Sequence, residues 1–223
     1  LMALEDDWNA QYERITSSKS RSNDRRKRRQ IEEHGTLTCR KAESLDEKQQ
    51  VMAEIIKQKE IKFIEMDELD QFEEQHIRDF YHKLIELDHN SGNPSYQLYG
   101  MFLDDLMLGG VMGSRVGTTF HGMIFSRIVA DIARYSPGRL MMLDVNEMLV
   151  SEGVKMHNFG TGFFEYKQKW CTGEEQRQHV IKALNFKGEI FLKLLRAAAM
   201  LKRFLKERQL QRHPVIGKLR TAF

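Results

Sequence analysis

The segment Tyr135-Ser136-Pro137-Gly138-Arg139 has the residue types of a phosphate-binding turn. A turn that leads into a helix presents free backbone amides and the positive end of the helix dipole, and both attract phosphate. Gly138 permits close approach of a ligand to the backbone, and Pro137 stiffens the entry to the helix. We therefore predict phosphate binding at residues 136–139. The alternative is that Ser-Pro-Gly only caps the helix.

A second glycine-rich segment, which contains Gly160 and Gly162, leads to Tyr166 and Lys167. The Lys167 ammonium group, next to an aromatic residue, is suited to lie beside a transferred carbonyl, a phosphate or a carboxylate. We predict catalytic roles for Tyr166 and Lys167 and a substrate-binding role for the two glycines. The alternative packs Tyr166 in the core and leaves Lys167 exposed.

Three residues are candidates for the general base that takes a proton from an incoming amine or hydroxyl group. His121 lies on an expected strand, and Asp144 and Glu147 lie on the polar side of an expected helix. A lone histidine on a strand is more often structural. The sequence contains no Ser-His-Asp elbow, HExxH or P-loop, which argues against hydrolases, zinc proteases and nucleoside triphosphatases. The eight histidines show no ligand spacing, so we predict no metal site.

The net charge of +3 hides a strong segregation along the chain. Residues 14–30 contain eight basic residues and one acidic residue, whereas residues 31–90 contain eight basic and sixteen acidic residues. From residue 165 to the end there are fourteen basic and five acidic residues. An anionic ligand would explain the two basic regions, so we predict substrate binding by Arg21, Arg25 and Arg26. Simple solvation is the alternative.

Composition excludes several classes of protein. With 41% hydrophobic and 30% charged residues, the chain has enough apolar material for a core. Cys39 and Cys171 are too few and too far apart for a disulfide scaffold. No apolar run approaches the roughly 20 residues of a membrane span, and the acidic start lacks a signal-peptide pattern. We expect a cytoplasmic protein, and the initial Leu1 suggests a fragment.

The order of expected elements places these residues on a mixed sheet. A helix over 8–33 is interrupted by serines, and Ser44 with Glu47 forms a capping box. An antiparallel meander follows, and then a strand, turn, helix and strand that imply a crossover between parallel neighbours. The expected strands are 36–40, 96–103, 106–111, 118–126, 154–159 and 179–185, and the later helices are 68–87, 139–152 and 189–211.

The ordered motifs resemble the C-terminal domain of the CelD-like family of GNAT-type acyltransferases, which are similar to Fem-type aminoacyl transferases. The resemblance covers roughly residues 8–175. Asn158 stands where the family often has aspartate, and Phe163 where it often has an acidic residue. The matching positions are Ser136-Pro137-Gly138, Gly153, Phe159-Gly160, Gly162, Tyr166-Lys167 and Trp170, preceded by Ser18-Lys19, Arg21, Asn23, Arg25-Arg26 and Gly35.

The resemblance implies an α+β, GNAT-like fold with helices on a mixed, largely antiparallel sheet. It implies that Ser136, Gly138 and Arg139 grip the pyrophosphate of acetyl-CoA or another acyl-CoA. The acceptor would be an amine or hydroxyl of a small molecule or polysaccharide precursor. Transfer from aminoacyl-tRNA and a non-catalytic role in binding nucleic acid or a partner stay open. We expect three regions, which are 1–90 as a remnant of or link to an upstream domain, 91–187 as the acyltransferase core, and 188–223 as a basic helix and tail.

Overall fold

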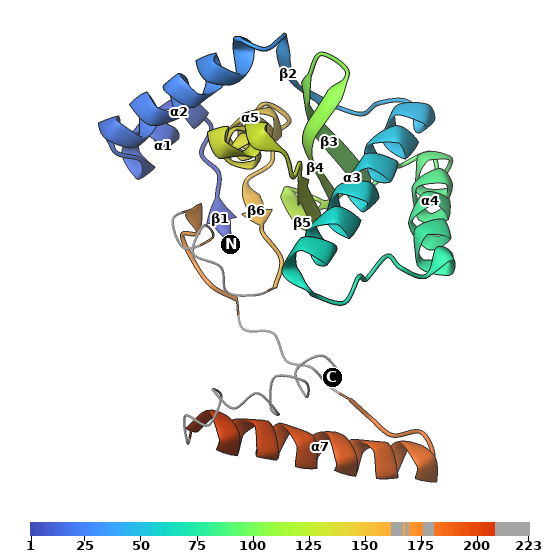
Figure 1. Cartoon of the computed structure of the whole chain (residues 1–223). Helices are drawn as coiled ribbons and strands as arrows, with labels where there is room; N and C mark the ends of the chain where they lie inside the picture. Colours follow the sequence, from blue (N-terminus) through green and yellow to red (C-terminus); the bar gives the residue numbers. More distant parts are fainter. Residues whose placement is uncertain (162–166, 168–169, 176–180, 208–223) are drawn as a thin grey trace. The chain divides into compact units, whose positions relative to one another are not determined.

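The computed structural model describes residues 1–161, 167, 170–175 and 181–207 (Figure 1). The chain divides into two compact units, Leu1–Glu174 and Glu175–Phe223. The first contains a six-stranded sheet with helices on both faces, and the second contains the helix α7 (Phe186–Glu207). None of the described helices is long and apolar enough to cross a bilayer.

The sheet is mixed and mostly antiparallel, as expected. Its central meander is confirmed, because β3, β4 and β5 pair antiparallel in chain order. β6 returns parallel to β5 after the helix α5, which confirms the predicted crossover. From one edge to the other the strands are β1 (Met2–Ala3), β6 (Met156–Asn158), β5 (Thr119–Arg127), β4 (Leu106–Val116), β3 (Tyr96–Leu103) and β2 (Leu37–Lys41).

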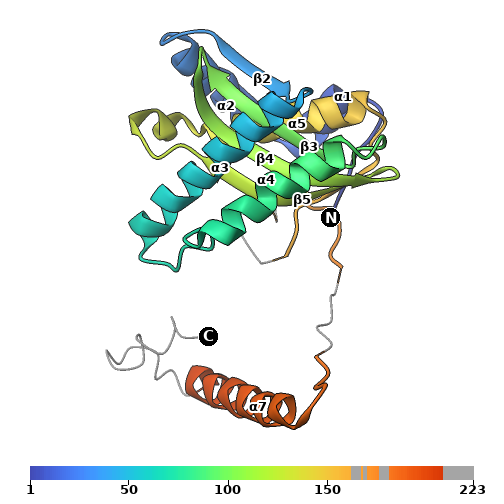
Figure 2. The same cartoon turned by 90° about the vertical axis from the view of Figure 1, so that its right-hand side faces the viewer.

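The helices form a layer on each face of the sheet. In Figure 2, α3 and α4 lie in front of the strands, and α1, α2 and α5 lie behind them. The expected break in the first helix is real, because the Ser17 hydroxyl accepts the Ser20 amide and starts a new helix. The capping box of Ser44 and Glu47 is also present. The helix bounds are α1 (Trp8–Ile15), α2 (Ser18–Glu32), α3 (Leu45–Met66), α4 (Gln75–His89) and α5 (Pro137–Ser151).

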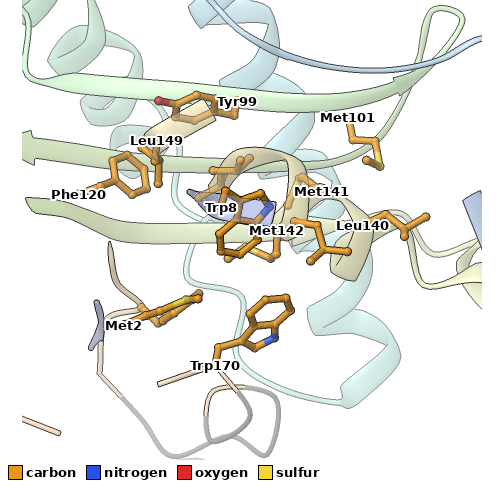
Figure 3. Packing of buried hydrophobic residues seen from close by; sticks show 14 of the residues in the cluster. Met2, Trp8, Tyr99, Met101, Phe120, Leu140, Met141, Met142, Leu149 and Trp170 are labelled. Atoms are coloured by element: carbon orange, nitrogen blue, oxygen red, sulfur yellow. The ribbon is translucent and has the colours of Figure 1, made fainter. Parts of the chain in front are cut away.

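Each layer buries its own apolar cluster against the sheet. On the α5 face, Trp8, Phe120, Met141 and Trp170 belong to one cluster (Figure 3), and the rings of Trp8 and Trp170 stack 6.4 Å apart. On the α3 face, Ile55 and its neighbours form the second cluster. The sheet is therefore buried on both faces.

The boundary expected near residue 90 is not a boundary of the structure. Residues before it supply both edge strands, since Met2 pairs with His157 and Leu37 pairs with Leu103. They also supply α3, whose apolar face covers one side of the sheet. The compact unit ends at Glu174 rather than at residue 187.

Two other expectations need correction. The helix expected from Glu68 begins at Gln75, because the Asp70 carboxylate accepts the Phe72 amide in a turn that buries the Phe72 ring. Residues 181–185 of the expected strand over 179–185 are not strand, and residues 179–180 lie outside the described residues. The basic helix α7 is present, and its expected end at Gln211 also lies outside them.

His157 occupies the centre of the α5-side cluster. Its Nδ1 lies 2.7 Å from Oδ1 of Asn146, and its ring stacks on Phe159 with centroids 4.1 Å apart. Its Nε2 is buried and has no hydrogen-bond partner among the atoms that the structure describes. Burial lowers the pKa of His157 to about 3, so the folded protein keeps this imidazole neutral.

We predict that His157 makes folding sensitive to mild acid. The unfolded chain binds this proton near pH 6.5, whereas the folded chain does not, so the free energy of unfolding falls as pH drops from about 6.5 toward 3. Between pH 7 and pH 5 the loss is about 2 kcal/mol, at about 1.4 kcal/mol per pH unit below 6.5. Urea unfolding at both pH values measures it.

His157→Gln should remove this difference, even though it lowers stability at pH 7. His76→Gln is the matched control, because the His76 side chain is largely exposed. An unchanged pH dependence in His157→Gln would show that the imidazole is not the group responsible.

Candidate active site

A cavity of about 710 Å³ opens between α3, β5, the N-terminal end of α5 and the segment after β6. This volume is within the range of small-molecule and cofactor sites. Its described lining residues are Gln58, Lys59, Lys62, Met123, Phe125, Ser126, Arg127, Ala133, Ser136, Pro137, Gly138, Arg139, Met141, Met142, Phe159, Gly160, Thr161, Lys167 and Trp170.

The charges on this lining have one sign. Its five charged members are all Lys or Arg, and none of the described lining residues is Asp or Glu. Two of the cations, Lys59 and Lys62, come from α3, and Arg127 ends β5. Aromatic and methionine side chains form much of the remaining wall. The cavity therefore suits a ligand with both anionic groups and apolar parts.

The N-terminal end of α5 forms one wall without a side-chain cap. Ser136 adopts the left-handed conformation, with φ 57° and ψ 51°, and Pro137 occupies the first turn. The Ser136 side chain does not bond to the helix amides, and its hydroxyl instead accepts a hydrogen bond from Nζ of Lys27 at 2.7 Å. A Cβ on Gly138 would meet no described atom closer than 3.7 Å. Pro137 has no amide hydrogen, and the Arg139 and Leu140 amides donate to the Ser136 carbonyl oxygen at 3.0 and 3.3 Å, so the Gly138 amide is the one in this turn without a described partner.

An ion pair fixes this wall to α2. The Arg139 guanidinium donates two hydrogen bonds of 2.8 Å to the Asp24 carboxylate, which also accepts one of 2.8 Å from the Tyr12 hydroxyl. Burial alone would raise the pKa of Asp24, but these hydrogen bonds outweigh it and lower the pKa. Arg139 also lies over the Trp170 ring, 5.0 Å from its centroid. Its guanidinium is therefore already engaged within the protein.

Lys167 contacts the segment after β6 that forms part of the cavity wall. Its Nζ donates hydrogen bonds to the carbonyl oxygens of Thr161 at 2.7 Å and Gly160 at 3.4 Å. Burial lowers the pKa of Lys167 below its ordinary value. The side chain thus ties the segment after β6 together at the edge of the cavity and brings a positive charge to it.

The structure brings together six of the residues singled out from the sequence. They are Ser136, Pro137, Gly138, Arg139, Gly160 and Lys167, and all line the cavity. Gly162 and Tyr166, which were also expected in the site, lie outside the described residues.

The other candidates are elsewhere and are engaged in contacts of their own. Nδ1 of His121 lies 3.4 Å from Nδ2 of Asn158. The Asp144 carboxylate forms an ion pair with Arg28. Burial raises the pKa of Asp144, although that ion pair opposes the shift. Arg21 donates to backbone oxygens at the end of α1, and Arg26 donates to Asn23 at 2.8 Å. Arg25 is exposed, and none of these residues is among those that line the cavity.

Sequence reasoning missed Lys59, Lys62 and Arg127, which line the cavity, and did not single out Lys27, which donates to Ser136. Lys27 was hidden among many cations, but it is three residues after Asp24, so both face α5. Lys59 and Lys62 lie within residues 31–90, whose net charge is negative. The net charge of that segment therefore gave no sign of a basic site. The spacing of the two lysines, three residues apart on one helix face, was the available signal.

Comparison with known proteins identifies the family. The family model for the acetyltransferase (GNAT) domain matches residues 18–168, which is more than half of the chain. The chain belongs to the GNAT acetyltransferase family. It is accordingly an acetyltransferase, and enzymes of this family use acyl-CoA as the donor. No match was found among curated protein sequences.

Solved structures of acetyltransferases are similar to this chain at low identity. An aminoglycoside acetyltransferase from an uncultured soil metagenomic sample, in complex with trehalose, is 14% identical, with a TM-score of 0.45, over 67% of this chain and 97% of that one. Its complex with sisomicin gives 11% identity with the same TM-score and coverage. The PaiA N-acetyltransferase of Thermoplasma acidophilum, in complex with coenzyme A, gives 10% and 0.39 over 53% of this chain and 75% of that one.

We predict that Asp24→Asn destabilises this GNAT domain by about 2–4 kcal/mol, because the partly buried Arg139 loses its charged partner. Urea unfolding measures the change. Asp6→Asn is the control, since the Asp6 carboxylate is 88% exposed in its pair with Lys155, and we expect it to change stability by less than about 1 kcal/mol. Equal effects of the two variants would contradict a structural role for the buried pair.

Proposed function

We propose that this enzyme binds acetyl-CoA, or another acyl-CoA, in the cavity at the N-terminal end of α5. It transfers the acyl group to an amine or hydroxyl of a small-molecule or polysaccharide-precursor acceptor. The observation that carries the proposal is the charge of the lining, with five cationic and no acidic residues among those described. Coenzyme A carries several phosphate charges on a long and partly apolar molecule, which matches such a lining.

The diphosphate is assigned to the uncapped end of α5. Backbone amides at a helix N-terminus bind phosphate through their hydrogens and the helix dipole. Gly138 leaves room for that approach, and Lys27 adds a positive charge at the Ser136 hydroxyl. Because the Arg139 guanidinium is held by Asp24, it contributes a fixed charge at the cavity wall rather than a mobile arm. The residues assigned to the donor are therefore Ser136, Pro137, Gly138 and Arg139, supported by Lys27.

Transfer proceeds by direct attack of the acceptor on the thioester carbonyl carbon. A new C–N or C–O bond forms, the C–S bond breaks, and the acceptor's proton is lost while the sulfur of CoA gains one. Negative charge develops on the carbonyl oxygen during attack, and a positive group close to it lowers the barrier. Lys167 is assigned this role because it lines the cavity, beside Gly160 and Thr161.

The charge of the cavity also bears on the acceptor. A polycationic acceptor would meet repulsion from the described lining, because no described carboxylate faces it. A neutral or anionic acceptor fits better. In this assignment the basic helix α2, with Arg21, Arg25 and Arg26, contributes to the positive field outside the cavity.

Calorimetry with acetyl-CoA tests the donor site through Gly138→Ala. The added methyl group makes only ordinary contacts in the free protein, so the variant should be at least as stable as the parent. We expect its dissociation constant for acetyl-CoA to rise about tenfold or more, equal to the loss of one hydrogen bond to a charged group.

Gly173→Ala is the matched control, because a Cβ there meets no described atom and the backbone is not left-handed. It should bind acetyl-CoA like the parent. Absence of acetyl-CoA binding by the parent chain, or equal affinities of the two alanine variants, would contradict the proposed site.

A further inference from the structure

The helix α7 (Phe186–Glu207) presents uncovered apolar side chains. Its start is well defined, since the Asn185 side chain accepts the Gly188 amide at 3.0 Å as a cap. Large apolar residues along it are exposed by between 46% and 79% of their surface. These residues are Phe186, Ile190, Phe191, Leu194, Met200 and Leu201.

The exposed residues lie on one side of the helix. At about 100° per residue, the six fall within an arc of about 180°. Arg196 lies outside that arc, whereas Lys187 and Lys193 lie within it. Exposed apolar side chains gathered in this way mark a surface that binds something.

The charge of α7 indicates what it binds. Its sequence contains six basic and two acidic residues, so the helix carries a net charge of +4. Nucleic acid would neutralise the cations but leave the apolar face in water. A second copy of the helix would cover the apolar face but bring two +4 charges together. An anionic bilayer surface satisfies both features, because headgroups meet the cations while the acyl boundary receives the apolar side chains.

We propose that α7 lies in the plane of an anionic phospholipid membrane, with Ile190, Phe191, Leu194 and Leu201 turned toward the acyl chains. The helix is not apolar enough to cross the bilayer. Its 22 residues extend about 33 Å along the surface, at 1.5 Å per residue. The unit that contains α7 is distinct from the acetyltransferase unit, so this binding would hold the enzyme at a membrane without using the cavity.

Co-sedimentation of the full chain with vesicles tests this inference. One set contains phosphatidylcholine and phosphatidylglycerol in a ratio of about 7:3, and the other contains phosphatidylcholine alone. We expect at least about tenfold tighter binding to the anionic vesicles, and weaker binding as NaCl is raised from about 0.1 to 0.5 M, because surface charges are screened.

A pair of variants with unchanged charge separates the apolar face from the rest of the helix. Phe191→Gln with Leu194→Gln should weaken vesicle binding about tenfold or more, through loss of buried apolar area. Ala199→Gln is the control, because Ala199 is exposed on the side of the helix opposite the apolar arc, and it should change binding less than about threefold. Thermal unfolding of the acetyltransferase unit should be the same in both, which shows that the chain remains folded.

Several outcomes would overturn the proposal. One is equal binding to the two kinds of vesicle, and another is equal loss of binding in the two variants. A third is an absence of vesicle binding. In that case, a dimer that is seen by sedimentation velocity and lost in Phe191→Gln with Leu194→Gln would assign the apolar face to a second copy of the chain. Retention of the chain on RNA would assign the helix to nucleic acid. Acetyl-CoA affinity is measured separately by calorimetry, so failure here would leave the proposed acyltransfer site untouched.

Discussion

The ion pair between Asp24 and Arg139 is the contact on which the arrangement of the site depends. It joins α2 to the first turn of α5, and Tyr12 and Trp170 complete it from two other segments. A carboxylate this deeply buried is stable only with charged and hydrogen-bonding partners. The partners therefore hold the end of α5 in one place, and the wall of the cavity is built on that end.

This pairing also decides which charges the cavity presents. Asp24 is turned toward Arg139 and does not line the cavity, and Asp144 is likewise turned toward Arg28. The cations that line the cavity are Lys59, Lys62, Arg127, Arg139 and Lys167. The carboxylates of Asp24 and Asp144 thus form ion pairs between α2 and α5. The described cavity lining stays positive, which matches a phosphate-bearing acyl donor.

The two compact units use positive charge differently. In the acetyltransferase unit, five cations line a cavity of about 710 Å³, so that several of them can contact one small anionic ligand. In α7 they are spread along a convex helix beside exposed apolar residues, which suits an extended anionic surface. The same excess of Lys and Arg in the sequence therefore corresponds to two kinds of ligand, and only the shape of each surface distinguishes them.

The sequence alone determined the local features. The interruption of the first helix by serines, the capping box of Ser44 and Glu47, the meander over 96–126 and the turn at Ser136 all follow from short-range hydrogen bonding and period, and each is present. The tertiary structure decided what those features contact. Strands β1 and β2 form the two edges of the sheet, although both come from residues 1–90, which read as a separate region. Lys59 and Lys62 of α3 and Arg139 of α5 line one cavity, although they are far apart in the chain. Such long-range contacts depend on how the helices pack on both faces of the sheet. Charge totals and hydrophobic periodicity describe short segments and do not predict that packing.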